Sequence, residues 1–332
     1  MNPPDQLLCL PVDGLGEVTE GADLAGLLAG AVALEDGDIL VVTSKVVSKA
    51  EGRVRTGKRD EALADETDRT VAWRGRTSIV RTHHGLVMAA AGIDASNTEA
   101  DTVVLLPRDP DASARRLREA LARRTGRNVA VLVTDTAGRA WRTGQTDIAV
   151  GAAGLDVLQD YAGRTDPHGN ELAVTAPAVA DELAAAADLV KRKLDRRPAA
   201  VVRGLSGLVL APGRHGPGAA ALVRDESQDM FGLGSREAVL SALHADDQRG
   251  FGGACTPLEL VVQLSALAED TAEVRVSGDT VTARLGGTER EQGAADARIR
   301  AAAFALGWTS TDDGPVEGPE DRPLLRFRPR TP

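Results

Sequence analysis

Two short apolar runs, each followed at once by hydroxyl and charged side chains, constrain the fold of this chain most strongly. Residues 39–42 read Ile-Leu-Val-Val and lead into Thr-Ser-Lys, and residues 129–133 read Val-Ala-Val-Leu-Val and lead into Thr-Asp-Thr. Short apolar runs rich in β-branched residues predict buried strands. Because strands fix positions while the following loops present polar groups, the sequence predicts functional side chains where these two strands end.

Helical patterns alternate with extended ones along the rest of this region. Helices are predicted over 22–34, over 61–73, from Asp111 onward and over 177–194, and further strands over 7–12, 78–91 and 199–202. The last helix ends in Lys191, Arg192 and Lys193, which are interpreted as complementing the negative end of the helix dipole. This alternation predicts an α/β to α+β core built on a mixed sheet.

The composition changes near residue 250. From there we predict two helices and two strands, over 257–268, 273–276, 280–285 and 294–306. The final residues, 309–332, are rich in Pro, Gly and charge, and we expect them to be mostly irregular. The predicted domains are therefore a core over 1–249, a small α+β appendage over 250–308, and a tail over 309–332.

Charge and composition exclude several classes of protein. The formal net charge is −10, which disfavours a general nucleic-acid binder. An acidic chain can still bind polyphosphates where metal ions and a few Lys or Arg residues supply local positive charge. No apolar run approaches the roughly 20 residues needed to cross a bilayer, and no signal-peptide pattern is visible. Cys9 and Cys255 form no metal-binding spacing. The sequence predicts a cytoplasmic protein without nucleic-acid or membrane partners.

Four polar clusters are candidates for a functional site. In residues 10–18, glycines would let backbone N–H groups approach a ligand, although taken alone they are explained better by a plain turn. Residues 43–52 gather hydroxyls with Lys45 and Lys49 at a strand end. Phosphate binding and a surface turn both remain open there, and the pattern is not a Walker A loop. In residues 91–97 a Gly precedes a carboxylate, which an Asx turn also explains.

The fourth cluster covers residues 134–145. Asp135 and Thr136 follow a buried strand, and Arg139 and Arg142 come shortly after them. Hard cations such as Mg²⁺ and Mn²⁺ prefer carboxylate, hydroxyl and phosphate oxygens. Guanidinium groups can neutralise an anionic substrate or developing phosphoryl charge, so we take Arg139 and Arg142 as candidates for holding substrate.

Together and in order, these motifs resemble the coenzyme F420-0:L-glutamate ligase family, including the N-terminal half of the fused actinobacterial enzymes. The matching runs lie at 10–15, 37–53, 90–97, 134–147, 166–172 and 223–231. The resemblance covers roughly residues 5–245 and implies a mixed-sheet ligase core. Position 16 is Gly where relatives commonly carry Pro. Residues 250–332 are too short for the flavin-binding nitroreductase domain of the fused enzymes, so no flavin reductase activity is expected.

The resemblance also implies ligands for individual residues. Asp94 and Asp135 would hold one divalent cation, Mg²⁺ or Mn²⁺, and Thr136 a second, with K⁺ as a further candidate cation. GTP would contact Leu15, Gly16, Glu17, Val18, Ser44, Lys49 and Asn97, and the segment around Arg224 would close over its phosphates.

The implied reaction transfers the γ-phosphoryl group of GTP to the lactyl-tail carboxylate of coenzyme F420-0. The amine of L-glutamate then attacks the acyl phosphate. Further glutamates can follow in successive rounds, and the resemblance implies a homodimer. Two other readings remain open. A metal-dependent GTPase or phosphohydrolase would use the same ligands with water as nucleophile, and a non-catalytic deazaflavin- or nucleotide-binding protein would bind without turnover.

Overall fold

The computed structural model describes residues 6–75, 77–95, 101–173, 175–311 and 323–330. The chain divides into two compact units, Met1–Val223 and Arg224–Pro332. Each unit is described by itself. No helix in the described ranges is both long and apolar enough to span a bilayer.

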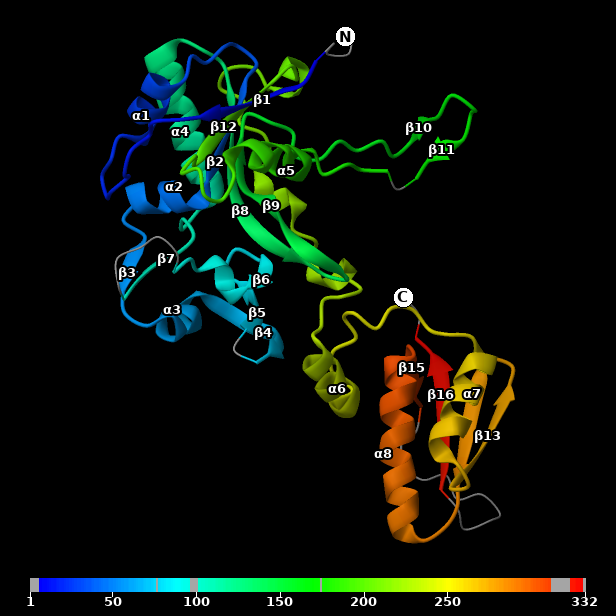
Figure 1. Ribbon diagram of the computed structural model, residues 1–332. Coiled ribbons are helices and arrows are strands. Elements are labelled where there is room, and N and C mark those ends of the chain that lie inside the picture. The colour runs from blue at the N-terminus through cyan, green and yellow to red at the C-terminus, as the bar shows by residue number, and fades with distance from the viewer. Residues whose placement is uncertain (1–5, 76, 96–100, 174, 312–322, 331–332) are drawn as a thin grey trace. The chain divides into compact units, whose positions relative to one another are not determined.

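The first unit is built on a five-stranded mixed sheet (Figure 1). Its strands, in spatial order, are β1 (Leu8–Val12), β12 (Ala199–Arg203), β2 (Ile39–Thr43), β8 (Ala130–Arg139) and β9 (Arg142–Ala153). Only β2 and β8 run parallel, and all other neighbours are antiparallel. The predicted mixed sheet in an α/β to α+β core is confirmed.

Helices cover both faces of this sheet. On one face α1 (Leu24–Ala31), α2 (Ser44–Ala50) and α4 (Pro110–Thr125) share a core with Val131 and Val133 of β8. On the other face α5 (Val179–Lys191) packs against Leu132. Since successive strand residues point to opposite faces, a strand covered on both sides must be apolar throughout. This explains the uninterrupted apolar runs at 39–42 and 129–133.

A smaller layer lies between β2 and α4 in sequence. It contains β3 (Val54–Thr56), α3 (Arg59–Glu66), β4 (Thr67–Arg74), β5 (Thr77–Thr82), β6 (Val87–Ala89), the 3-10 turn η1 (Ala90–Gly92) and β7 (Thr102–Val104). The predicted helix over 61–73 is wrong in its second half, because α3 ends at Glu66 and β4 follows directly. Thr67, Thr70, Val71 and Trp73 explain the change, since β-branched and aromatic residues favour strands.

A hairpin and several short turns complete the first unit. Strands β10 (Arg164–Thr165) and β11 (Glu171–Leu172) form a hairpin that projects away from the sheet in Figure 1. The 3-10 turns η2 (Ser206–Leu208) and η3 (Ala219–Leu222) follow β12.

The second unit has its own sheet and core. Its elements are η4 (Glu226–Gln228), α6 (Ser235–His244), α7 (Pro257–Ala268), β13 (Ala272–Ser277), β14 (Thr280–Leu285), α8 (Glu289–Ala305), β15 (Trp308–Ser310) and β16 (Leu324–Pro329). The antiparallel sheet has the order β13-β14-β16-β15, and α7 and α8 pack on one face of it through Leu260, Leu264 and Ile299.

Two features of this unit differ from the sequence expectation. The tail from residue 309 is not mostly irregular: it contributes to β15 and supplies β16. Leu325 and Phe327 alternate with Arg326 and Arg328, so β16 presents one apolar face to the core. The division of the chain falls at Val223/Arg224, ahead of the expected boundary after residue 249. Helix α6, which lies between these two points, packs against α8.

Candidate active site

Two of the polar clusters meet where β2 and β8 end. These strands are parallel and adjacent, with Thr43 opposite Thr134, so their carboxyl ends lie at the same edge of the sheet. Helix α2 begins directly after β2 with Ser44, whose hydroxyl donates to Oδ1 of Asp135 at 3.0 Å. Residues 91 positions apart in sequence are thus in direct contact.

Asp94 comes from the smaller layer and lies against the carboxyl ends of β2 and β8. We call this part of the molecule the corner. Its backbone exchanges hydrogen bonds with Val104, N to O at 3.0 Å and O to N at 2.8 Å. Its carboxylate pairs with Nζ of Lys45 at 2.5 Å. Two residues earlier, Gly92 has a φ of +68°, and a Cβ placed there would lie 3.2 Å from Oδ2 of Asp135. Glycine at this position adopts the left-handed backbone without strain and avoids a tight contact with the Asp135 carboxylate.

The electrostatics of the corner favour a bound cation. The pKa of Asp135 is raised to about 7, mainly because burial removes the carboxylate from water, and the negative charges of Asp147 and Asp94 act in the same direction. Hydrogen bonds from the Ser44 hydroxyl and the Thr136 backbone act in the opposite direction. Neighbouring carboxylates are costly to ionise together, and a divalent cation between them relieves that cost.

Thr136 belongs to a second polar group on the α5 side of β8. Its hydroxyl donates to Oδ1 of Asp147 at 2.8 Å, and the hydroxyl of Thr134 donates to Oδ2 at 3.0 Å. Nζ of Lys191 donates to the same Oδ2 at 2.5 Å and to Oγ1 of Thr134 at 3.0 Å. Because the Thr136 hydroxyl donates its hydrogen bond to Asp147, the lone pairs of the Thr136 oxygen remain available to a cation.

Sequence reasoning missed Asp147 and Lys191. Both are almost fully buried, with side chains 4% and 5% exposed respectively. The signal for Lys191 was present, because Ala180, Ala184, Ala187 and Lys191 recur at helical spacing on the buried side of α5. A lysine on an apolar stripe indicates a buried partner, whereas a lysine that only complements the helix dipole lies on the exposed side.

The loop after β1 buries its apolar side chains and exposes the carboxylate of Glu17. Leu15 and Val18 are buried in the core, with exposures of 5% and 3%, so a nucleotide would meet their backbone rather than their side chains. Between them, Glu17 pairs with Nζ of Lys49 at 2.5 Å, and this hydrogen bond lowers the pKa of Glu17. Gly16 has a φ of +67°, a value closed to proline. The loop therefore has a conformation here that a Pro at this position could not adopt.

Arg139 and Arg142 lie further out, opposite each other at the tip of the β8–β9 hairpin. Nη2 of Arg139 donates to the carbonyl oxygen of Thr143 at 3.0 Å. Four residues along a strand span about 13 Å, so the Arg139 backbone is well removed from Asp135. Asn97 lies outside the described residues, and Arg224 belongs to the second unit. The structure thus brings Ser44, Lys45, Asp94 and Asp135 together.

The donor set suits a hard cation that shares its coordination with a substrate. Among the residues that the structure describes, no group of three or more His, Cys, Asp or Glu side chains could hold a metal. Mg²⁺ commonly binds proteins through one or two carboxylates and takes its other ligands from water and substrate phosphates. Asp94 and Asp135 fit that pattern, while the Thr136 hydroxyl lies with Asp147 on the α5 side of β8.

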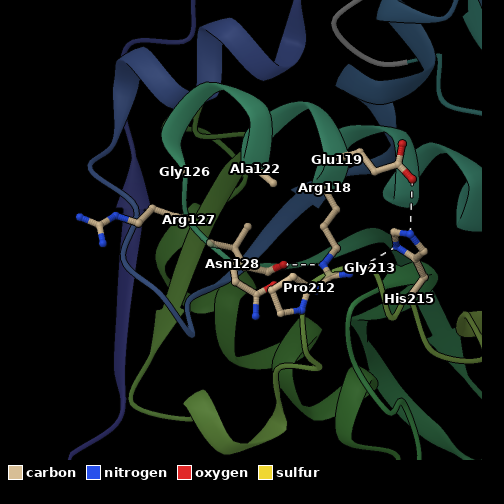
Figure 2. Close-up of a pocket in the computed structure, with 10 residues that line it drawn as sticks. Arg118, Glu119, Ala122, Gly126, Arg127, Asn128, Pro212, Gly213 and His215 are labelled. Atoms are coloured by element: carbon tan, nitrogen blue, oxygen red, sulfur yellow. Dashed lines mark hydrogen bonds and ion pairs between the residues drawn. The ribbon is translucent and has the colours of Figure 1, made fainter.

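A separate cavity lies near the amino end of β8, at the opposite edge of the sheet. Figure 2 shows Arg118, Asn128 and His215 on its wall. The Arg118 guanidinium donates to the carbonyl oxygens of Val129, Leu210 and Arg214 and to Oδ1 of Asn128, at 2.8–3.0 Å. Its donors are thus occupied in fixing the loop that follows η2, which indicates a structural role.

Comparisons with known proteins place the chain in a family. The family model described as F420-0:Gamma-glutamyl ligase matches residues 14–62 and 57–204. The coenzyme F420:L-glutamate ligase of Archaeoglobus fulgidus is 42% identical over 218 residues, which are 59% of this chain and 87% of that protein. The protein of the same name from Methanothermobacter thermautotrophicus is 38% identical over 246 residues, 66% of this chain and 96% of that protein.

These matches define the chain as a ligase that forms an amide bond. It belongs to the F420-0:gamma-glutamyl ligase family. The match to the family model ends at residue 204, within the first unit.

Proposed function

We propose that this chain joins L-glutamate to coenzyme F420-0 in a GTP-dependent reaction. The observation that carries the proposal is the meeting of Ser44, Lys45, Asp94 and Asp135 at one sheet edge. These residues come from three separate segments, all of them within the ranges that the family model matches. The names of the relatives supply the substrates, coenzyme F420 and L-glutamate.

The coenzyme carboxylate must be activated before an amine can replace one of its oxygens, because oxide (O²⁻) is not a viable leaving group. A carboxylate oxygen of the lactyl tail attacks the γ-phosphorus of GTP and GDP departs, which leaves an acyl phosphate. The uncharged amine of glutamate then attacks the acyl carbon, the C–O bond to phosphate breaks, and the amine loses a proton to solvent. The products are the amide, GDP and inorganic phosphate.

The residues at the corner have separate parts in this reaction. Ser44, Lys49 and the backbone of Leu15, Gly16, Glu17 and Val18 bind the nucleotide, and Asn97 and Arg224 are further candidates for that role. Asp94 and Asp135 hold one divalent cation, Mg²⁺ or Mn²⁺, and Thr136 a second, with K⁺ as an additional candidate. Such cations neutralise phosphate charge and orient the phosphoryl group.

Arg139 and Arg142 are proposed to hold the anionic substrate or glutamate from the hairpin tip. Replacing either by Ala is expected to raise the KM for coenzyme F420-0 or for glutamate by roughly tenfold, since each loses a charge-assisted hydrogen bond. The KM for GTP should stay unchanged. Steady-state kinetics with each substrate varied in turn would check this, and unchanged constants for both substrates would remove the two arginines from the site.

We further propose a homodimer. The hairpin of β10 and β11 stands off the sheet with Arg164, Thr165 and Glu171 exposed, and we propose it as the contact with a second chain. Light scattering on the purified protein is expected to give twice the chain mass of 34.6 kDa. A monomer at micromolar concentration would contradict this part of the proposal.

The ligation itself is tested by one assay with purified protein, coenzyme F420-0, L-glutamate, GTP and Mn²⁺. Mass spectrometry is expected to show the coenzyme heavier by one or more glutamyl residues, with no such product when GTP or glutamate is omitted. Phosphate release that proceeds equally without glutamate and coenzyme would indicate a GTPase instead. Tight binding without turnover would indicate a binding protein.

A further inference from the structure

In the second unit, helices cover one face of the sheet, and no described helix packs on the other, which we call the open face. Val281, Ala283 and Leu285 of β14 point into the core beneath α7 and α8, and so do Leu325 and Phe327 of β16. Because strand residues alternate, the residues between them point to the other side. No helix of the described residues in this unit shares a core with that side.

Arginines dominate the open face. In the strand register Arg275 lies opposite Thr282, and Thr282 lies opposite Arg326. The neighbouring positions on the same face add Arg284 and Arg328. We call Arg275, Arg284, Arg326 and Arg328 the arginine face. The described acidic residue on it is Glu273, which is paired with Arg275.

The arginine face is positively charged although the second unit as a whole is acidic. Residues 224–332 carry 19 Asp and Glu against 12 Arg and no Lys, a formal net charge of −7. One member of the face also has spare hydrogen-bonding capacity, since Nη1 of Arg284 is buried without a partner among the described residues. A buried donor of this kind calls for a ligand or an ordered water. Both observations indicate a surface that binds anions.

The chemistry of the face selects among anionic partners. Guanidinium groups bind carboxylates through two parallel hydrogen bonds. The aromatic residues of this sheet, Trp308 and Phe327, are both in the core, so the described part of the open face offers no ring for stacking on bases. A flexible polycarboxylate therefore fits the face better than single-stranded RNA does.

We propose that the arginine face binds the oligo-γ-glutamyl tail of the product, an inference that rests on the proposed function. Each glutamate that is added consumes one carboxylate and brings two, so the tail gains one negative charge per round. A tail that is held on the enzyme between rounds is present at a raised effective concentration for the next addition. The arginine face thus favours longer tails without taking part in the ligation step.

The test uses the full chain and a fluorescently labelled hexa-γ-L-glutamate at low ionic strength, with binding followed by anisotropy. Arg326→Gln/Arg328→Gln is expected to weaken binding by about tenfold, because two exposed ion pairs are lost. The matched control is Arg290→Gln/Arg298→Gln, which removes two exposed charges from α8 and should leave the affinity unchanged. In the ligation assay the face variant should make shorter tails while the first addition keeps its rate.

Two outcomes would overturn the inference. One is an equal loss of affinity in the face variant and the α8 control, which would show that the oligomer responds only to the net charge of the protein. The other is a single-stranded RNA of equal charge that binds at least as tightly as the γ-glutamyl oligomer. If the wild-type chain makes no amide product at all, the proposed function fails, while the anisotropy comparison still decides whether the face recognises polycarboxylates.

Discussion

Replacing Asp135 by asparagine is expected to lower kcat/KM for ligation by roughly 10²–10³, the scale typical for loss of one preorganised charge at a phosphoryl-transfer site. Asparagine keeps the size of the side chain and can still accept the hydrogen bond from Ser44. It removes the negative charge that a cation needs. Steady-state kinetics over a range of Mn²⁺ concentrations would show whether the loss is in metal affinity, in turnover, or in both.

The same variant, although it lowers activity, is expected to raise the thermal stability of the metal-free protein. The folded-state pKa of Asp135 is raised to about 7 from a usual value of 3.8. Between these two values the folded state binds more protons than the unfolded state, so the Asp135 contribution to stability is present at low pH and is lost as pH rises towards 7. Asp135→Asn should therefore unfold at a higher temperature than wild type at pH 8 in chelator.

The control for this prediction is Asp36→Asn, in the exposed turn before β2 at the opposite edge of the sheet. It should leave both kcat/KM and the Mn²⁺ dependence as in wild type. Retention of wild-type kcat/KM by Asp135→Asn, together with an unchanged response to Mn²⁺, would remove this carboxylate from the site.

Replacing Lys191 by methionine is expected to lower the free energy of unfolding by roughly 3–5 kcal/mol, because it leaves the buried Asp147 carboxylate without its cation. Both side chains are nearly inaccessible to water. Urea denaturation in chelator would measure the loss. The variant should also weaken Mn²⁺ binding, since Asp147 then no longer has a fixed position from which to orient the Thr136 hydroxyl.

Asp38→Asn separates these two effects. Asp38 is equally buried at the other end of β2 and pairs with Nε of Arg203 at 2.8 Å. Loss of its charge should destabilise the fold while Mn²⁺ affinity, read from the electron paramagnetic resonance signal of free Mn²⁺, stays unchanged. If Lys191→Met and Asp38→Asn lower Mn²⁺ affinity equally, the Lys191–Asp147 pair has only a structural role.

The sequence predicted the parts of the fold that depend on local pattern. The strands at 39–42 and 129–133 could be found because a strand buried on both faces needs an unbroken apolar run. The contact between Ser44 and Asp135 follows from the parallel pairing of β2 and β8, which local pattern does not reveal. The approach of Asp94 to Asp135 depends on a left-handed backbone at Gly92, so only the family resemblance could pair these two carboxylates in advance.

Other features were hidden by competing signals. The charges of Arg59–Glu66 support a helix, and nothing in their periodicity marks its end at Thr67, where β-branched residues begin. The alternation of Leu325 and Phe327 with arginines is short and lies in a segment rich in Pro and charge, so composition concealed β16. Lys191 was assigned to the helix end by its position, although its spacing from Ala187 and Ala184 placed it on the buried stripe.

An isotope transfer experiment tests the central claim most directly. Coenzyme F420-0 carrying ¹⁸O in both oxygens of its lactyl carboxylate would be incubated with the protein, L-glutamate, GTP and Mn²⁺. Activation through an acyl phosphate predicts one ¹⁸O in each released phosphate and the other ¹⁸O in the carbonyl of the new amide. Released phosphate that contains no ¹⁸O, whether or not amide forms, would contradict the account.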